Sequence, residues 1–295
     1  MALVMPERSE QELVRFAKLK ELRSTGYPFP NDVRVDGSSA EVLNAPLEQK
    51  ENARRFTLAG RIVALRLMGK ASFFHLLDGA GKIQVYVKQD DIGEALFSKY
   101  KSWDIGDIVE VKGYAFVTKT GEKSLHAESL RLLTKSLIPL PEKWHGLTDV
   151  EARYRHRYVD LIANPEVREI FKKRAKIIQE IRRYFDEHGY VEVETPVLQT
   201  IAGGATAKPF KTQHNALGCD MYLRIALELP LKKLIVGGLE RVYEIGRIFR
   251  NEGVSKKHNP EFTMLEFYQA YATFEDLMAL SEELITGLVN RIQGG

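Results

Sequence analysis

The chain has 295 residues, of which 44% are hydrophobic and 28% charged, so it is long enough for two domains with cores of their own. A single cysteine, Cys219, excludes an internal disulfide framework and a cysteine-based zinc cluster. The net charge of +3 is too small to indicate a nucleic-acid-binding protein by itself.

The N-terminal segment lacks the apolar core of a signal peptide, and no membrane span follows, so we expect a cytoplasmic protein without a membrane partner. Residues 9–25 have the pattern of an amphipathic helix, which Gly26 and the prolines after it end. A loop-rich segment then continues to about residue 54. We therefore expect residues 1–54 to form an N-terminal helix and loop extension.

Residues 55–140 contain five segments with strand patterns, at 56–63, 71–77, 82–88, 107–116 and 124–133. In the third segment Ile83, Val85 and Val87 alternate with polar or amphipathic residues, which predicts one buried and one exposed face. Five short strands with glycine turns, and a helix before Gly106, favour a small closed barrel of the OB-fold type.

A basic strip lies inside this region. Residues 52–77 contain no acidic side chain but include Arg54, Arg55, Arg61, Arg66 and Lys70. Such a strip beside Phe73, Phe74 and His75 could contact a phosphate backbone. The alternative is an ordinary solvated strand face.

Pro139 and Pro141 predict an interdomain linker over 141–150, after which the pattern changes to that of an α+β domain over 151–295. We expect a helix from about Val167 to Gly189, then strands at 190–195, 222–227, 241–252 and 261–271. Further helices are predicted at 228–237 and 274–292. The last of these has one apolar stripe, composed of Phe274, Leu277, Met278, Leu284, Ile285 and Leu288. This order predicts a mostly antiparallel sheet with flanking helices.

Two neighbouring strands of the second domain have side chains suited to binding a ligand. On strand 261–271 an aromatic, a thioether, a carboxylate and a phenol share one face, namely Phe262, Met264, Glu266 and Tyr268. Burial of Glu266 without a partner would be costly, and a cleft that takes a cationic ligand would justify it. The alternative is an exposed edge position for Glu266.

Arg250 and Glu252 lie two residues apart, which would place them on one face of strand 241–252. An arginine guanidinium can bind a phosphate through two parallel hydrogen bonds. Taken alone the pair is a weak signal, because surface ion pairs have the same spacing.

The longer stretch Phe249-Arg250-Asn251-Glu252, followed by a polar loop and His258-Asn259-Pro260-Glu261-Phe262, resembles motif 2 of the class II aminoacyl-tRNA synthetases. The similarity extends through residues 221–226, Glu228, Lys232 and 236–238, and it is greatest to lysine-specific members with an N-terminal anticodon-binding OB domain. The resemblance implies ATP-dependent attachment of lysine to tRNA(Lys) through a lysyl-adenylate. It also implies an OB-fold β-barrel followed by the first part of a class II catalytic domain.

The resemblance also implies roles for individual residues. Arg250 and Glu252 would be catalytic, and ATP would be bound by Arg250, His258, Asn259 and Phe262, with Phe262 stacked on adenine. L-lysine would be bound by Gly204, Glu228, Glu266 and Tyr268, with the glycine and the glutamates around its α-amino group and the tyrosine reaching its side-chain amine. The chemistry agrees, since an ammonium group needs carboxylates and a phenol oxygen.

In the first domain the resemblance assigns the anticodon contacts to Arg66, Phe73 and Gln84. Filling the core is the alternative role for Phe73, although it lies on the opposite strand face from Phe74. Pro196 would lie in the interface of a homodimer. The cofactors implied are ATP and Mg²⁺, with the magnesium ligands beyond the end of this chain.

Two departures from the family pattern affect these expectations. Pro230 follows Glu228, where the family has a proline before the glutamate, which could shift Glu228. The chain also ends before the third motif, so we expect it to be incomplete for catalysis. The alternatives are a non-catalytic tRNA-binding fragment, an aspartyl or asparaginyl specificity, and a fragment that folds poorly because a sheet edge is exposed.

Overall fold

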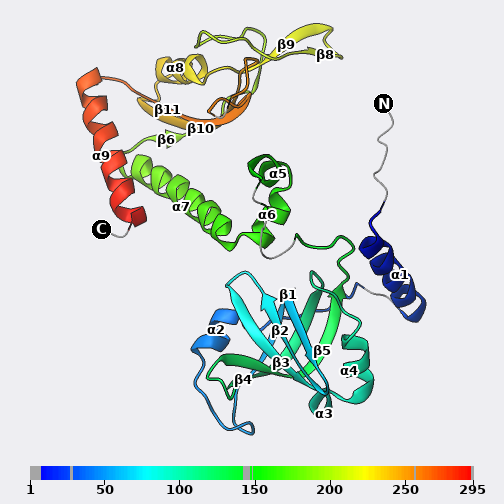
Figure 1. Cartoon of the computed structure of the whole chain (residues 1–295). Helices are drawn as coiled ribbons and strands as arrows, with labels where there is room; N and C mark the ends of the chain where they lie inside the picture. Colours follow the sequence, from blue (N-terminus) through cyan, green and yellow to red (C-terminus); the bar gives the residue numbers. More distant parts are fainter. Residues whose placement is uncertain (1–7, 27–28, 142–146, 148, 256, 294–295) are drawn as a thin grey trace. The chain divides into compact units, whose positions relative to one another are not determined.

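The computed structural model describes residues 8–26, 29–141, 147, 149–255 and 257–293. The chain divides into two compact units, Met1–Ala163 and Asn164–Gly295, and each is described by itself (Figure 1). Most of the linker predicted at 141–150 lies outside the described residues.

The first unit is built on a closed five-stranded barrel with the strand order β1-β2-β3-β5-β4. Its strands are β1 (Arg55–Met68), β2 (Ala71–Leu77), β3 (Lys82–Lys88), β4 (Ile108–Val117) and β5 (Lys123–Thr134). The barrel closes because β1 is long enough to pair with β4 through its first half and with β2 through its second. The predicted OB-type barrel is confirmed.

Alternation along the strands determines which side chains fill the barrel. In β3 the residues Ile83, Val85 and Val87 are at most 1% exposed, as the pattern predicted. Phe74 points into the same core, so Phe73 lies on the outer face and the core-filling role for Phe73 is excluded.

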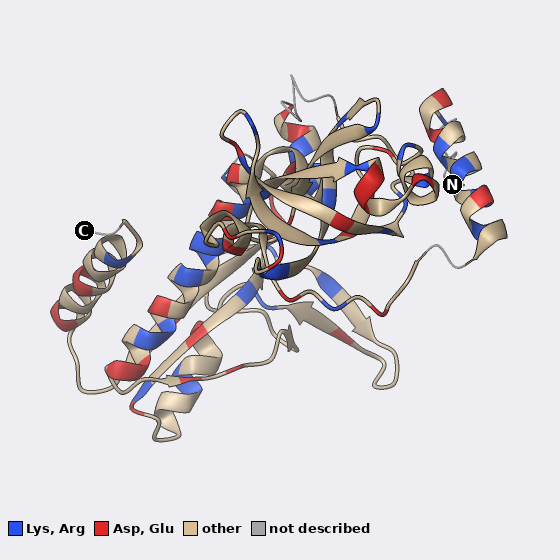
Figure 2. Cartoon of the chain, turned by 90° about the horizontal axis from the view of Figure 1, so that it is seen from below, with Lys and Arg blue, Asp and Glu red and all other residues tan. Residues whose placement is uncertain are grey.

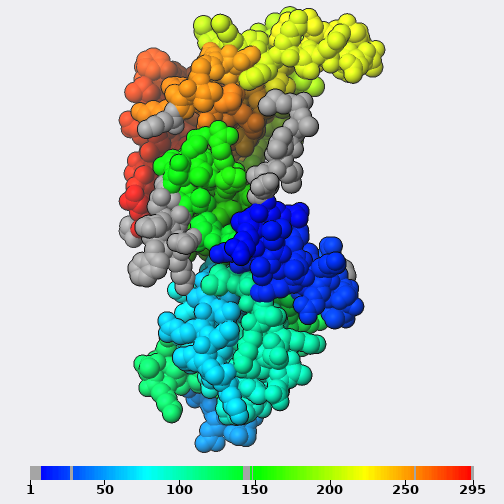
Figure 3. Space-filling model, turned by 45° about the vertical axis from the view of Figure 1, so that its right-hand side comes forward, coloured from blue at the N-terminus to red at the C-terminus, as the bar shows by residue number. Residues whose placement is uncertain are grey.

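Short helices surround the barrel: α1 (Glu10–Thr25), α2 (Ser39–Asn44), α3 (Gln89–Ile92) and α4 (Glu94–Tyr100). Helix α1 is held by polar contacts, since Lys18 Nζ lies 2.8 Å from Asp104 Oδ1 and Arg15 donates to the Ser136 carbonyl at 3.3 Å. Figure 3 shows the atoms of α1, in dark blue, against this unit. Two further helices, α5 (Val150–Arg155) and α6 (Arg157–Ala163), complete the first unit.

The second unit has two three-stranded sheets. One has the order β11-β10-β6, with β6 (Val191–Glu192), β10 (Arg241–Phe249) and β11 (Glu261–Gln269). The other has the order β7-β9-β8, with β7 (Leu198–Gln199), β8 (Lys211–His214) and β9 (Cys219–Leu223). All described strand pairs in this unit are antiparallel except β6 with β10, so the predicted mostly antiparallel α+β architecture is confirmed.

Three helices flank the β10–β11 pair (Figure 1): α7 (Pro165–Glu187), α8 (Glu228–Val236) and α9 (Phe274–Gln293). One face of the pair packs with α7 and α9 through a cluster that includes Tyr243 and Phe267. The opposite face packs with α8 through Val242, Ile248 and Leu231. A ligand site beside Glu266 therefore lies on the α8 side of the sheet.

Several predicted boundaries were wrong in this unit. The strand predicted at 190–195 has regular pairing only at 191–192, the one at 222–227 is shifted to 219–223, and β10 ends at Phe249 rather than at residue 252. The apolar stripe of α9 is also divided. Leu284 is 7% exposed and packs with α7, whereas Phe274, Met278 and Ile285 are each more than 50% exposed.

Basic and acidic side chains are interspersed along the helices and strands (Figure 2). Within the described residues, no helix is both long and apolar enough to cross a membrane.

Candidate functional site

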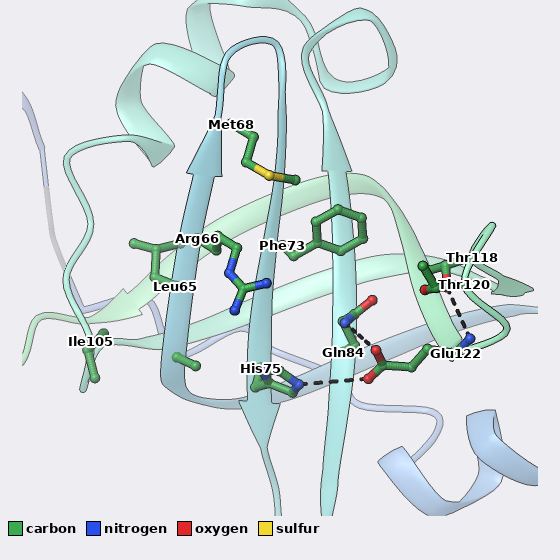
Figure 4. Close-up of a pocket in the computed structure, with 11 residues that line it drawn as sticks. Leu65, Arg66, Met68, Phe73, His75, Gln84, Ile105, Thr118, Thr120 and Glu122 are labelled. Carbon is green, nitrogen blue, oxygen red and sulfur yellow. Dashed lines mark hydrogen bonds and ion pairs between the residues drawn. The ribbon is translucent and has the colours of Figure 1, made fainter. Parts of the chain in front are cut away.

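A pocket of about 610 Å³ lies on the outer face of the barrel, and it is lined by the three residues expected to contact an anticodon (Figure 4). Arg66 and Phe73 are direct partners across β1 and β2, and Gln84 lies on β3 opposite His75. The ladder register therefore places a cation, an aromatic ring and an amide on one surface. These are the groups that bind the phosphates, faces and edges of unpaired bases.

His75, which lies beside the basic strip, also lines this pocket, as does Glu122, which sequence reasoning missed. The Gln84 side-chain amide donates to Glu122 Oε2 at 2.7 Å, and Ser124 Oγ donates to Gln84 Oε1 at 3.0 Å. The amide is thus held at both ends. Glu122 comes from the loop between β4 and β5, where no alternation pattern could have identified it.

In the second unit the candidate ligand site is assembled on residues 224–227, which connect β9 to α8. All four residues are at most 3% exposed. The Leu227 amide donates to Glu266 Oε1 at 3.0 Å, and the Ile225 carbonyl accepts from Arg250 Nε at 3.3 Å. One buried segment therefore holds both the carboxylate and the guanidinium that the sequence singled out.

Glu266 is partly buried on β11, and the chain itself supplies two donors to it. Besides the Leu227 amide, the Tyr268 hydroxyl donates to Glu266 Oε2 at 3.1 Å. Burial, and then the nearby Glu266 carboxylate, raise the pKa of Tyr268, so the phenol keeps its proton and remains a donor. Strand β11 is an edge strand, as the alternative supposed, but the Glu266 side chain is not exposed. These two bonds leave carboxylate lone pairs for a further donor.

Gly204 and Glu228 lie together at the start of α8. A Cβ atom on Gly204 would come within 3.1 Å of the Cβ atoms of Glu228 and Ala226, and φ at Gly204 is +90°. Only glycine meets both conditions without strain. Glu228 also contacts Lys232, whose Nζ lies 2.6 Å from Glu228 Oε1 and 5.8 Å from the centre of the Tyr268 ring. Pro230 occupies the first turn of α8, as expected.

Arg250 and Phe262 form the second part of the site. The Arg250 Cζ lies 5.3 Å from the centre of the Phe262 ring, within the range of a cation–π contact. Phe262 pairs with Ile248 across the two strands and packs on the α8 side of the sheet, as Glu266 does. Phe262 and Glu266 therefore share one face of β11, as expected, and the Arg250 guanidinium contacts the Phe262 ring.

The expectation that Arg250 and Glu252 share a strand face is wrong. Strand β10 ends at Phe249, and the Glu252 amide donates to the Arg250 carbonyl at 3.0 Å, which closes a tight turn. Glu252 and Asn259 are exposed in this structure. His258 is also exposed, and its Nδ1 lies 2.8 Å from Ser255 Oγ. The polar loop thus does not bring these three side chains to Arg250.

A buried ion pair beneath the site was also missed from the sequence. Arg224 Nη1 lies 2.6 Å from Glu244 Oε1, and both side chains are 4% exposed. Arg224 further donates to the carbonyls of Arg247 at 2.8 Å and Thr195 at 2.9 Å. A Cβ on Gly246 would lie 2.2 Å from Arg224 Nη2, so the glycine leaves room for the guanidinium. Arg224 thus anchors segment 224–227 to β10.

Pro196 is exposed and follows Thr195, the residue that contacts Arg224. Exposed apolar side chains flank it, since Val197 is 37% and Leu198 is 46% exposed. Among the residues that the structure describes, no group of three or more histidine, cysteine, aspartate or glutamate side chains could hold a metal ion.

Comparison with known proteins gives two family matches. Residues 149–295 match the family described as "tRNA synthetases class II (D, K and N)", and residues 56–133 match the "OB-fold nucleic acid binding domain". The second match coincides closely with the five barrel strands.

Individual relatives agree with these matches. The chain is 53% identical over 295 residues to a lysine–tRNA ligase of Thioalkalivibrio sulfidiphilus, with 97% of this chain and 59% of the relative covered. It is 51% identical over 294 residues to one of Coxiella burnetii, covering 98% and 59% respectively. With one of Tolumonas auensis it shares 54% identity over 299 residues, covering 99% and 58%. The chain therefore spans somewhat less than three fifths of these relatives.

Proposed function

Because this chain belongs to the class II tRNA synthetases of the aspartate, lysine and asparagine group, we propose that it carries the anticodon-reading domain and part of the amino-acid-activating site of a lysine–tRNA ligase. In the reaction of the whole protein, the lysine carboxylate attacks the α-phosphate of ATP, which forms lysyl-adenylate and releases pyrophosphate. The lysyl group then passes to the 3′ end of tRNA(Lys).

The observation that carries this proposal is the shared anchoring of Arg250 and Glu266. They bond to the Ile225 carbonyl and the Leu227 amide, two residues apart in one buried segment. A group suited to phosphate and a group suited to ammonium are therefore held at neighbouring positions. Such a placement favours reaction by fixing two substrates side by side, which is the main requirement of a transfer that uses no covalent enzyme intermediate.

We assign the side chains the following roles. Arg250 binds the α-phosphate and Phe262 stacks on the adenine ring. Glu266 and Glu228 surround the α-amino group of lysine, and Tyr268, whose hydroxyl donates to Glu266, reaches the side-chain amine. Gly204 leaves the space beside Glu228 open. Glu252, His258 and Asn259 would need the polar loop to change conformation before they could contact ATP. These roles require no metal ligand from the described residues.

Lysine rather than aspartate is favoured by the charges in the site. The two carboxylates of Glu228 and Glu266 and the Tyr268 phenol oxygen favour a ligand with a second ammonium group, whereas a side-chain carboxylate would be repelled. Lysine, aspartate and asparagine should therefore be compared as substrates in ATP–pyrophosphate exchange. Exchange that depends on lysine supports the proposal, whereas exchange with aspartate or asparagine alone would reassign the specificity.

Glu266→Gln provides a sharper test of the lysine site. The amide can still accept from Leu227, but it carries no charge for an ammonium group. We expect lysine affinity, measured by calorimetry or as the Michaelis constant in exchange, to fall by about 10- to 100-fold. Glu261→Gln is the matched control, because Glu261 is an exposed residue at the start of the same strand. Equal lysine affinity of the Glu266 variant and the wild type would refute the assigned role.

RNA binding without catalysis is a second candidate function, favoured by the barrel pocket. Arg66, Phe73 and Gln84 line one cavity. This cavity belongs to the domain whose residues 56–133 match the OB-fold nucleic acid binding family. A chain that binds a lysine-anticodon stem-loop but shows no lysine-dependent exchange would fit this function. We also infer a cytoplasmic location. We further infer a homodimer through the surface around Pro196, and sedimentation of the wild type and of Leu198→Ser would test the dimer.

A further inference from the structure

The outer face of the barrel contains a row of rings that extends from the pocket across four strands. Phe73 on β2 pairs with Tyr86 on β3, Tyr86 with His126 on β5, and His126 with Tyr114 on β4. These four residues are direct cross-strand partners, so their side chains lie side by side at one level of the barrel. Only Phe73 among the four lines the pocket.

Each ring in the row contacts the next. The ring centres of Phe73 and Tyr86 are 5.0 Å apart, those of Tyr86 and His126 are 5.1 Å apart, and those of His126 and Tyr114 are 5.0 Å apart. Phe116 packs against both Tyr86 and His126, with centres at 5.6 and 5.2 Å. These separations are those of favourable aromatic pairs.

The end of the row away from the pocket is fixed by hydrogen bonds. His126 Nε2 lies 2.8 Å from Asp91 Oδ2, and His126 Nδ1 lies 3.2 Å from the Tyr114 hydroxyl. The Asp91 carboxylate can only accept, so His126 Nε2 donates to it, and Nδ1 shares a hydrogen bond with the Tyr114 hydroxyl. His126 therefore cannot rotate without breaking two bonds, and its ring meets the Tyr86 ring at an interplanar angle of 88°.

Phe73 has no polar atom with which to fix its own ring, and a base that stacks on it needs a platform already in place. We propose that Tyr86 is a positioning residue for RNA binding, which holds the Phe73 ring in the orientation that the pocket uses to stack an unpaired base. This inference rests on the proposed RNA-binding role of the barrel. Tyr86 itself need not touch the RNA.

The test is the affinity of the full chain for a short RNA stem-loop with the lysine anticodon, measured by fluorescence anisotropy. Tyr86→Leu removes the ring but keeps an apolar side chain, and we expect binding to weaken by about 2- to 12-fold, the range of a lost aromatic pair. Tyr86→Phe keeps the ring and should restore wild-type affinity. Tyr154→Leu is the matched control, because Tyr154 is an exposed tyrosine outside the barrel.

A second RNA separates positioning from general damage. In this stem-loop the anticodon nucleotides lack their bases, so only the backbone can bind. Tyr86→Leu should bind it as the wild type does, with the same dependence on salt, because the phosphate contacts are unchanged. A variant that merely unfolds the barrel would lose this affinity as well.

The outcomes distinguish the positioning role of Tyr86 from the base-reading function of the pocket. A wild type that prefers the complete stem-loop, together with a Tyr86→Leu variant of equal preference, would overturn the positioning role alone. A wild type that binds both RNAs equally would overturn the base-reading function of the pocket, and the positioning role with it.

Discussion

In the barrel, Arg66, Phe73 and Gln84 are brought together by the register of three adjacent strands, whereas in the second unit Arg250 and Glu266 meet through a connection between elements. The residues that line the barrel pocket are thus brought together by the pairing of the strands, because the register determines which side chains are neighbours. The second site depends on segment 224–227, which is not a strand, and on the buried Arg224–Glu244 pair that holds it.

This difference indicates where each site can be damaged. A residue on the outer face of the barrel can be replaced without altering the backbone, because the ladder hydrogen bonds remain. The second site has no such redundancy, since one guanidinium contacts Thr195, Glu244 and Arg247 together. Loss of that group should affect every residue that segment 224–227 positions.

The largest effect is therefore expected from Arg224→Met, which leaves the Glu244 carboxylate buried without its cation. We expect the second unit to lose about 3–5 kcal/mol of stability, the usual cost of breaking a buried pair. Hydrogen exchange measured by mass spectrometry should show reduced protection in residues 164–295 and unchanged protection in the barrel strands. Arg182→Met is the control, because its ion pair with Glu192 is partly exposed and worth at most about 1 kcal/mol. An equally small loss for Arg224→Met would contradict the anchoring role.

A single alanine substitution in each unit should affect only that unit. A Cβ on Gly246 would lie 2.2 Å from Arg224 Nη2, and one on Gly113 would lie 1.9 Å from the His126 carbonyl oxygen. We expect each change to cost about 2–3 kcal/mol through overpacking, Gly246→Ala in the second unit and Gly113→Ala in the barrel. Hydrogen exchange during thermal unfolding would measure the loss of stability in each unit separately. Gly79→Ala, which meets no atom within 4 Å, should change stability by less than about 0.5 kcal/mol.

The barrel should also lose stability at high pH, because it contains a buried tyrosine. Burial raises the pKa of Tyr100 to about 12, and the hydroxyl lies 2.6 Å from Ser72 Oγ. The folded chain holds this proton more tightly than the unfolded chain, whose tyrosine pKa is about 10. The resulting stabilisation is complete below pH 10 and is lost as the pH rises toward 12, by roughly 2 kcal/mol.

Tyr100→Phe should remove most of this alkaline loss, at a cost near neutral pH of about 1 kcal/mol for the missing hydrogen bond. Urea unfolding of the barrel at pH 7 and at intervals above pH 10 would measure both effects. Identical alkaline slopes for the variant and the wild type would show that Tyr100 is not the group responsible.

The smallest effect is expected from Lys232→Met. The Glu228–Lys232 pair spans one helical turn with a side-chain exposure of 33% and 54%, so its removal should change stability by about 0.5 kcal/mol or less. A larger loss in thermal unfolding would mean that the contact of Lys232 with the Tyr268 ring contributes to the fold of the second unit.

The sequence predicted the barrel well because alternation is a local signal. Ile83, Val85 and Val87 mark the buried face of β3, and the same period places Phe73 outside and Phe74 inside. The choice of Arg66, Phe73 and Gln84 came from family resemblance, and the ladder then placed them in one pocket. Glu122 was missed because a loop residue has no period to reveal its direction.

The second unit was predicted less accurately because its site depends on distant contacts. Nothing in the local pattern joins Arg224 to Glu244, which are connected only by folding. The error at Glu252 has a similar cause. The turn after Phe249 is closed by a backbone hydrogen bond, and no glycine or proline within residues 250–252 marks it in the sequence. The stripe of α9 was divided because helix α7 covers only part of it.

Strand β9 gives the molecule a convenient spectroscopic handle. Cys219 is the only cysteine in the sequence, and it lies on β9 beside the exposed strand β8, where it pairs with His214. A thiol-reactive dye would consequently attach at one position in the unmodified chain. Its emission would report events in the second unit, while the fluorescence of Trp103 reports on the barrel core.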